Sequence, residues 1–469
     1  MKGKLNEEKL KRYFEHHADI QFPTVEQAKQ SDKITAFYCE GMVDMTQYNE
    51  YFAHVYHYIM TGGQSLSDTE LPPMQTVDSM EKMVHILLSG NLVFYKEKAT
   101  NFLIVDISKV PQRQPSESNT EISIKGPKDA FTEEISINVS LIRKRLKTSE
   151  LYNEQFQIGT ISPTKVSLLY LANKANPDMI KEVCHRLETF QIESLVSSGQ
   201  LEQWISDRTF TLFPLFDYIG RPDFVIECLL RGRFVLIIDG SPMVLIGPIN
   251  VFELLKSPED IHFPYHFVIF QRGLRFLGLL FAIFVPGFWI ALSSVNIDQI
   301  PFSLLATVVT SREGLPIPVV LEALLLLGLF ELLREAGIRL PKAVGQTIGI
   351  VGGIIIGDAV IRAGLASPIM LVVMAISAVS TFALVNQSLT GTVSILRIVT
   401  ILVSALLGIY GFFLSMFGIF IYLTRLESFG MAYLEPMSSL QVKEFLSALV
   451  MNPFKRKKYS ANILKKRKG

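Results

Sequence analysis

The density of charged residues changes near residue 275, and this change constrains the fold more than any other feature of the sequence. The first 275 residues include 64 charged ones, about 23%, as expected of a water-soluble domain. From Phe276 to Leu423 only 12 of 148 residues are charged, about 8%, and apolar runs follow one another. The sequence therefore predicts a soluble half joined to a membrane half with several spans. A chain of this kind is expected to sense, gate or transport.

Two stretches of the soluble half repeat one order of elements. In the first, the hydrophobic pattern predicts strand, helix, helix, strand and strand at Ile34 to Tyr38, Tyr48 to Met60, Met80 to Leu88, Leu92 to Tyr95 and Phe102 to Ile107. In the second, the same pattern falls at Val166 to Leu171, Pro177 to Leu187, Phe224 to Leu230, Phe234 to Ile238 and Met243 to Ile246. The soluble half therefore reads as a duplicated α/β unit.

The junctions between helix and strand support this duplication. The run Ile86-Leu-Leu-Ser-Gly-Asn-Leu-Val-Phe matches Cys228-Leu-Leu-Arg-Gly-Arg-Phe-Val-Leu, with a glycine after each helix end. Glycine suits the left-handed conformation that closes a last helical turn. Asp239-Gly-Ser-Pro between two apolar runs predicts a hairpin turn. We expect two related α/β subdomains, at residues 34–150 and 151–272, after a polar N-terminal segment at residues 1–33.

The soluble half shows no pattern typical of an enzyme. It has no glycine-rich phosphate loop, Walker lysine, nucleophile elbow or HExxH motif. His54 and His57 lack further metal ligands, and three scattered cysteines favour buried apolar roles over a zinc site. Arg143 and Arg145 are expected on a solvated helix face. We therefore expect no catalytic activity, no metal and no cofactor.

The membrane half, residues 273–425, is expected to be all α-helical. Four apolar segments are long enough to span a bilayer: Phe276 to Val295, Ala343 to Ile361, Pro368 to Val385 and Ile398 to Leu423. The last is long and contains Gly408, Gly411 and Gly418, so it is expected to tilt or bend. A fifth run, Pro318 to Leu333, holds two glutamates and is expected to be re-entrant or interfacial.

The two ends of the chain bear on the number of crossings. No signal peptide precedes the soluble half, which is therefore expected to be cytosolic. The tail at residues 426–469 is basic, and its cluster Lys455, Arg456, Lys457 and Lys458 is expected to contact anionic lipid head groups from the same side. If both ends of the chain are cytosolic, the number of membrane crossings must be even, and four crossings are favoured. Five crossings would suit the charges of the short loops but would place the tail outside.

Small and charged residues in the membrane half are the candidate functional residues. Glycine recurs every four residues, a spacing that lets another helix approach closely, at Gly345, Gly349, Gly353 and Gly357. That helix could be in the same subunit or in a neighbouring one. Intramembrane charges are candidates for pore lining or gating, here Glu322, Glu331, Asp358 and Arg362.

The spacing of these charges limits what they can do together. Glu322 and Glu331 are nine residues apart and face opposite ways on a straight helix, so they cannot line one pore together. Asp358 and Arg362, four residues apart, are expected either to neutralise each other or to serve in gating.

Several motifs in order resemble the A-subunit family of spore germinant receptors (GerA type). In the soluble half they are Lys125-Gly-Pro-Lys-Asp-Ala-Phe-Thr-Glu, Asn138, Leu141-Ile-Arg-Lys-Arg-Leu, Arg221-Pro-Asp and Asp239-Gly-Ser-Pro. In the membrane half they are Arg312-Glu-Gly-Leu-Pro, Phe330-Glu-Leu-Leu-Arg-Glu-Ala-Gly-Ile-Arg-Leu-Pro, Gly345-Gln-Thr-Ile-Gly-Ile-Val-Gly-Gly and Ala363-Gly-Leu-Ala-Ser-Pro. The chain departs from the usual pattern at Gly220, Ala130, Ile261, His262 and Ala432, which leaves the subfamily and its nutrient open.

The resemblance implies a multi-pass protein of the spore's inner membrane. It implies two partners, a transporter-like B subunit to which nutrient binding is chiefly attributed and a lipoprotein C subunit. The A subunit would form a homo-oligomer and gate the ion release that starts germination. The alternative is a subunit of a small-solute transporter, for which we expect an internal repeat in the membrane half. Nucleic-acid binding is not expected, because no aromatic platform accompanies the basic residues.

Overall fold

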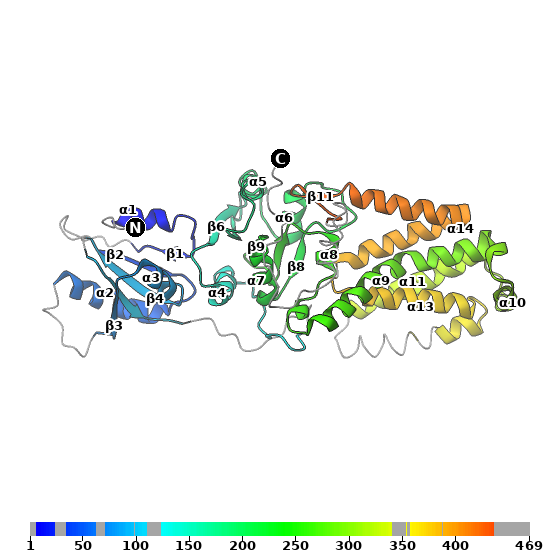
Figure 1. Ribbon diagram of the computed structural model, residues 1–469, viewed down its shortest axis with the longest axis horizontal. Coiled ribbons are helices and arrows are strands. Elements are labelled where there is room, and N and C mark those ends of the chain that lie inside the picture. Colours follow the sequence, from blue (N-terminus) through cyan, green and yellow to red (C-terminus); the bar gives the residue numbers. More distant parts are fainter. Residues whose placement is uncertain are drawn as a thin grey trace.

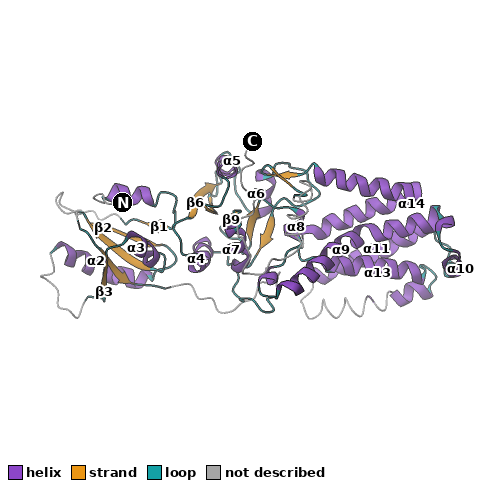
Figure 2. Ribbon diagram, viewed as in Figure 1, coloured by secondary structure: helices purple, strands orange, loops and turns teal. Residues whose placement is uncertain are grey.

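The computed structural model describes residues 6–23, 34–61, 71–97, 99–109, 123–339, 353, 357–386 and 388–435. Three parts follow one another along the longest axis: a first sheet with its helices, a second sheet with its helices, and a bundle of helices (Figure 1). Strands are confined to the two sheets and to one short ribbon beside the bundle (Figure 2).

The first sheet has five strands in the order β1-β2-β4-β5-β3, and every neighbouring pair is antiparallel. Its strands are β1 (Ile20–Gln21), β2 (Ile34–Cys39), β3 (Met74–Val77), β4 (Asn91–Lys96) and β5 (Phe102–Asp106). Its helices are α1 (Glu7–Tyr13), α2 (Met45–Met60) and α3 (Met80–Leu87). One face of the sheet packs with α1 and α3, and the other packs with α2.

The second sheet has five antiparallel strands in the order β6-β7-β9-β10-β8. Its strands are β6 (Leu151–Ile158), β7 (Thr164–Leu171), β8 (Asp217–Ile219), β9 (Phe234–Ile238) and β10 (Val244–Gly247). Its helices are α4 (Ile135–Arg145), α5 (Pro177–Glu188), α6 (Ser198–Ile205) and α7 (Pro222–Leu230).

The two sheets are copies of one topology, which confirms the predicted pair of related α/β units. Strands β1 to β5 correspond in order along the sheet and in pairing to β6 to β10. Gly90 and Gly232 close the equivalent helices α3 and α7 with φ of 98° and 91°. A side chain would strain this left-handed conformation, and a Cβ would also lie 2.3 Å from the Met42 oxygen or 2.7 Å from the Lys174 oxygen.

Two segments pack differently from the predicted division. Helix α4 was assigned to the first subdomain, but its Ile135, Val139 and Ile142 lie in the core of the second sheet with β7 and β9. In the N-terminal segment, Leu10 of α1 and Ile20 of β1 belong to the core of the first sheet. The exact boundaries at residues 33, 150 and 272 remain a prediction.

The remainder of the described chain is largely helical. It begins with α8 (Val251–Leu254) and the short 3-10 helix η1 (Pro258–Ile261), and its long helices are α9 (Tyr265–Ile290), α11 (Val319–Arg339), α13 (Pro368–Phe382) and α14 (Ser388–Thr424). A π-helical turn η2 (Ala291–Val295) extends α9, and η3 (Ile297–Gln299) and α10 (Phe302–Thr310) follow. Strands β11 (Glu427–Ser428) and β12 (Met431–Ala432) end the described part. Among the described residues, two helices are long and apolar enough to cross a membrane, Tyr265–Val295 and Ser388–Thr424, the second counted across a break at Gly408.

Helix α14 is a hairpin of two helical arms. Gly408 interrupts it with φ 61° and ψ −140°, outside the helical region. A Cβ on Gly411 would lie 2.3 Å from the carbonyl oxygen of Val403, so the second arm folds back along the first. Figure 1 shows the two arms running side by side. The predicted bend is confirmed, but it reverses the chain, so the predicted single span from Ile398 to Leu423 is wrong.

Within the bundle, the close helix contacts centre on α9. A Cβ on Gly287 would lie 3.1 Å from Thr400 of α14, and one on Gly278 would lie 3.3 Å from the Ser380 oxygen of α13. Small residues allow such approach between helices in an apolar medium. The hydroxyl of Thr400 donates to the Ile283 oxygen (2.9 Å), and that of Ser377 donates to the Ala282 oxygen (2.8 Å).

The segment from Pro318 to Leu333 falls almost entirely in α11, a continuous helix of 21 residues that contacts α9, α13 and α14. Its expected re-entrant or interfacial position in the membrane stays a prediction. Leu326 and Leu327 are buried in the bundle core with Met370 and Met374 of α13.

Candidate functional site at the junction of the second sheet and the bundle

Three ionic clusters connect the second sheet to the first helix of the bundle. The first fixes the start of α9. Asp260 of η1 accepts hydrogen bonds from Arg272 Nε (2.7 Å) and Arg275 Nη1 (3.0 Å), and its side chain is 3% exposed. Arg275 also donates to the Leu255 oxygen at 3.1 Å. A buried carboxylate is stable only when paired, so these bonds fix the direction in which α9 leaves η1.

The second cluster joins η1 to the N-terminus of α7. Arg221 forms ion pairs with Glu259 and with Asp223, the latter at 2.6 Å. His262 Nε2 lies 2.9 Å from Asp223, and Glu259 accepts a hydrogen bond from the Lys125 backbone N–H at 3.1 Å. Burial alone would raise the pKa of Glu259, but Arg221 and the Lys125 N–H outweigh it and hold that pKa below its usual value.

The third cluster surrounds Glu253 of α8. Its carboxylate pairs with Arg231 at 3.2 Å, with Arg233 at 3.4 Å and with Lys256 at 2.5 Å. Burial would raise the pKa of Glu253, yet the three cations hold it well below the usual value. Burial and the neighbouring Arg231 lower the pKa of Lys256 to about 7. This lysine therefore titrates near neutral pH, unlike an exposed one.

Two of the motifs that carry the family resemblance, Lys125-Gly-Pro and Arg221-Pro-Asp, meet at the second cluster. Gly126, from the Lys125-Gly-Pro motif, lies against Arg221 of the Arg-Pro-Asp motif, where a Cβ would be 2.3 Å from Nη2. The same Cβ would lie 2.7 Å from the His262 ring. Sequence reasoning missed this site because its partners lie far apart, Lys125 and Glu259 being separated by 134 residues. The available signal was the group of charged residues in the otherwise apolar stretch from Arg221 to Arg233, where two acids lie between arginines.

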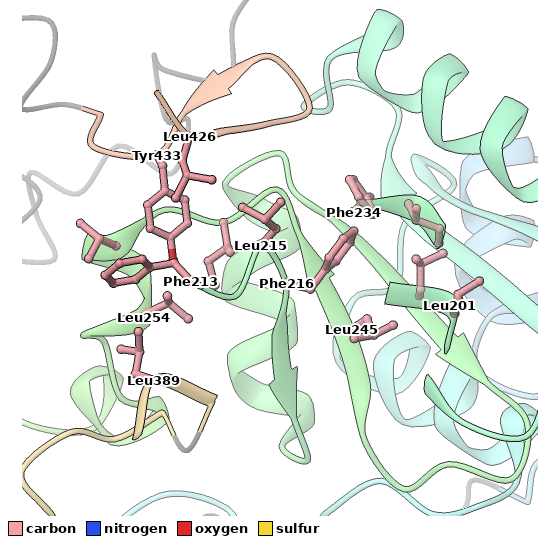
Figure 3. Packing of buried hydrophobic residues seen from close by; sticks show 14 of the residues in the cluster. Leu201, Phe213, Leu215, Phe216, Phe234, Leu245, Leu254, Leu389, Leu426 and Tyr433 are labelled. Atoms are coloured by element: carbon pink, nitrogen blue, oxygen red, sulfur yellow. The ribbon is translucent and has the colours of Figure 1, made fainter. Parts of the chain in front are cut away.

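A second set of contacts ties the end of the bundle to the second sheet. The backbone N–H of Leu212 donates to the Tyr422 hydroxyl (2.9 Å), and the Leu212 oxygen accepts from Thr392. Tyr433 donates to the Pro214 oxygen at 2.8 Å. Figure 3 shows the loop with Phe213 and Leu215 between Tyr433 and Leu426 on one side and Leu254 and Leu389 on the other. Both arms of α14 are thus held to the soluble half.

The predicted glycine stripe is only partly described. Gly345 and Gly349 lie outside the described residues, as do Lys455, Arg456, Lys457 and Lys458. Among the described residues, a Cβ on Gly353 would meet no heavy atom within 4 Å, and one on Gly357 would meet only Leu371 at 3.6 Å. At these two positions the described part of the chain supplies no tight helix contact.

The predicted charges of the bundle have separate partners. Glu322 is 1% exposed and accepts two hydrogen bonds from Ser367, from the N–H and the hydroxyl, both at 2.6 Å. Glu331 pairs with Arg334 at 2.5 Å and accepts from the Ser394 hydroxyl at 2.5 Å. The two glutamates therefore face different neighbours, as their spacing predicts.

Asp358 and Arg362 form the expected i,i+4 pair. The Nε–Oδ2 distance is 2.8 Å, and the side chains are 58% and 79% exposed within the single chain. Asp358 and Arg362 therefore pair with each other in the described part of the chain, and a role in gating remains a prediction.

The soluble half holds one buried ion pair that sequence reasoning placed in solvent. Arg143 is 0% exposed and binds Asp19 through Nε (2.7 Å) and Nη2 (3.0 Å). The prediction of a solvated helix face is wrong for Arg143, because α4 packs between the two sheets and Asp19 approaches from the distant β1 segment. Arg145 is 28% exposed and pairs with Asp129.

A polar cavity of about 400 Å³ lies beside this ion pair, between the two sheets. Its polar lining comes from β1, β2, α4, β6 and β7: Asp19, Gln21, Tyr38, Glu40, Glu134, Ser136, Asn153, Gln155, Lys165 and Ser167. Asn153 is 3% exposed and donates to Asp19 at 3.2 Å, but its Oδ1 has no hydrogen-bond partner within the part of the chain that the structure describes. A buried acceptor of this kind is costly unless a solute or water satisfies it.

Across the described ranges, no group of three His, Cys, Asp or Glu side chains is placed to hold a metal ion. The three cysteines are free; Cys39 and Cys228 are buried, and Cys184 is partly exposed. Burial raises the pKa of all three thiols, so the reactive thiolate is disfavoured.

Comparison with known proteins identifies the family. The family model described as Bacillus/Clostridium GerA spore germination protein matches residues 8–463. The chain belongs to the GerA spore germination family. It is 41% identical to spore germination protein XA of Bacillus anthracis over 464 residues, covering 97% of this chain and 94% of that protein. The predicted resemblance to the A-subunit type of germinant receptor protein is thereby confirmed.

Other similar proteins are also spore germination proteins. Identity is 35% to spore germination protein KA and 34% to spore germination protein A1, both of Bacillus subtilis strain 168, with 80% and 82% of this chain covered. These matches cover 69% and 80% of the two relatives. A solved structure, the N-terminal domain of the A subunit of the Bacillus megaterium spore germinant receptor GerK3, is 26% identical. It matches with a TM-score of 0.39, covering 51% of this chain and 92% of that one.

Proposed function

We propose that this GerA-family chain is the A subunit of a nutrient-sensing germinant receptor. Its bundle would assemble with further copies in the spore's inner membrane and gate ion release, and a partner that binds the nutrient would trigger the gate. The main support for this proposal is the set of three ionic clusters between the second sheet and the bundle, which we call the ionic junction. In it, Asp260 pairs with Arg272 and Arg275 of α9. A rearrangement of the soluble half can reach α9 through these buried bonds.

The path of the chain supports a cytosolic soluble half and an even number of membrane crossings. The chain leaves the second sheet at α9 and returns at Leu426, and Leu426, Tyr433 and Phe234 lie in one hydrophobic cluster. The entry and exit of the bundle are therefore on the same side. With Lys455 to Lys458 on the cytosolic side, the arrangement follows the positive-inside tendency.

We expect the predicted glycine stripe to mediate the assembly of copies of this chain. Around the Cβ position of Gly357 the described residues place only Leu371, at 3.6 Å, so a larger side chain has room there. We expect Gly357→Leu to leave the single chain folded while separating the copies, because the stripe would allow close helix approach between them. Gly418→Leu is the matched control, since its Cβ position is also open.

The test is the mass of the purified complex, with conductance measured in planar bilayers. The proposal predicts an oligomer for the native chain and for Gly418→Leu, with ion conductance in the presence of the B and C subunits. It predicts smaller particles without conductance for Gly357→Leu. A Gly357→Leu chain that assembles and conducts like the native one would contradict this role of the stripe.

The alternative function, a subunit of a small-solute transporter, predicts a different result in vesicles. A transporter accumulates a labelled nutrient inside vesicles, whereas a gated channel releases ions without nutrient uptake. Nutrient uptake that depends on this chain would favour the alternative.

A second binding function is favoured by the polar cavity between the two sheets, where Asn153 Oδ1 lacks a partner. A small polar solute that donates a hydrogen bond to this oxygen would fit. Amino acids, sugars and nucleosides can be screened for a rise in the thermal unfolding midpoint of the full chain. A rise that is lost in Asn153→Leu but kept in the exposed control Asn101→Leu supports the site; a rise kept in both variants contradicts it.

A further inference from the structure

The bundle contains a second cavity, of about 400 Å³, between α11, α13 and α14. Its described lining is mostly apolar and comes from Phe330, Leu333, Gly337, Ile338, Gly353, Ala375, Ala378, Val379 and Phe382. The polar exceptions are Glu331, Arg334, Thr381 and Arg397. The cavity is thus mainly apolar, with charged side chains on one part of its wall.

Arg397 is the unusual member of this lining. It is 2% exposed, and its Nη2 donates to the Thr381 hydroxyl at 2.9 Å. Its buried Nε has no hydrogen-bond partner among the described residues. Glu331, the one carboxylate among the described lining residues, is occupied by Arg334 and by the Ser394 hydroxyl, each at 2.5 Å.

The charges of the lining do not balance. Two guanidinium groups face one carboxylate, which leaves one positive charge in apolar surroundings. An arginine inside a membrane span is costly unless its charge is paired. An anion in the cavity would offset this cost and would satisfy the free Nε–H.

We infer that this cavity binds an amphipathic monoanion, with its oxyanion on Arg397 and its apolar part against Phe330, Val379 and Phe382. The volume falls in the range of about 300–1,000 Å³ that is usual for small-molecule sites. The anion has two chemical sources, a free alkyl carboxylate or the head group of an anionic lipid. The site requires the folded bundle only and does not depend on ion gating.

The test uses the purified full chain in detergent, with decanoate as the charged probe and decanol as its uncharged equivalent. Decanoate is expected to raise the thermal unfolding midpoint of the native chain, and decanol is not. Arg397→Gln is expected to bind decanoate at least about tenfold more weakly, as for the loss of a charge-assisted hydrogen bond. The control Arg362→Gln removes an exposed arginine outside the lining and is expected to behave like the native chain.

Native mass spectrometry of the chain extracted from membranes distinguishes the two sources. An anionic lipid that stays on the native chain and Arg362→Gln but leaves Arg397→Gln identifies a lipid head group. A lipid-free chain that binds decanoate identifies a free carboxylate. The inference is overturned if Arg397→Gln binds decanoate as tightly as the native chain. Should that variant fail to fold, equal binding of decanoate and decanol by the native chain overturns it.

Discussion

At the scale of single residues, the soluble half depends on a small buried cluster where the two sheets meet. Burial would raise the pKa of Asp19, but Arg143 outweighs it and lowers that pKa to about 2. Removing one partner of such a buried pair costs about 3–5 kcal/mol, because a lone charge remains. His17 lies 3% exposed beside the pair and donates from Nε2 to the Ser149 oxygen at 3.0 Å.

His17 gives this cluster a pH dependence that can be measured. Burial and then Arg143 lower its pKa from 6.5 to about 4. The unfolded chain therefore takes up a proton below pH 6.5 that the folded chain refuses until about pH 4. The contribution of His17 to the free energy of unfolding is fully present above pH 6.5. It is lost as the pH falls from 6.5 to about 4, by about 3 kcal/mol in total.

The measurement is urea unfolding followed by Trp204 fluorescence in a Trp289→Phe background, between pH 7 and 4.5. His17→Gln cannot take up the proton and is expected to flatten the pH profile. The exposed control His54→Gln is expected to keep the native slope. A native profile that is flat between these pH values would contradict the burial of a neutral His17.

At the scale of elements, the bundle depends on a few positions where only glycine fits. Gly408 reverses α14, and a Cβ there would lie 2.1 Å from Asn296 Oδ1. The same Asn296 oxygen accepts the Ile409 backbone N–H at 2.9 Å, so the loop after η2 fixes the tip of the hairpin. The hairpin and α9 are therefore packed as one unit.

Gly408→Ala is expected to lower the stability of the bundle strongly. The backbone conformation alone costs a side chain about 1–3 kcal/mol, and the overlap with Asn296 adds to this. Gly418→Ala, in the second arm, places its Cβ in open space and is expected to be neutral or slightly stabilising. The thermal midpoint of the monodisperse chain in detergent compares the two. Equal midpoints would mean that Gly408 does not make the turn described here.

The elements also show how far sequence reasoning reaches. Central strands such as β2 and β9 could be predicted to within one or two residues, because their apolar pattern is continuous. The four edge strands β1, β3, β6 and β8 could not be predicted, since β1, β3 and β8 are short and apolar residues alternate with polar ones in β6. The hairpin in α14 could be predicted only as a bend, because a glycine indicates flexibility but not the angle.

At the scale of the whole molecule, the candidate site was the least predictable part. The resemblance to the family could be stated from local motifs, and comparison confirms it. The ionic junction requires residues from three distant segments, and no local periodicity brings Lys125, Arg221 and Glu259 together. The proposed function rests on this junction, since it is the buried connection between the soluble half and α9.

The most direct test of this account is ion release from spores that carry Arg272→Gln. The variant removes one of two arginines from Asp260 at the base of α9, while the control Arg339→Gln removes an exposed arginine that pairs with Glu335. With equal amounts of both variants in the membrane, nutrient-triggered ion release is expected to slow by about 5-fold to 150-fold in Arg272→Gln, the usual range of coupling between sites. Arg339→Gln is expected to match the native spores. Native kinetics in Arg272→Gln would contradict the claim that this junction couples the soluble half to the bundle.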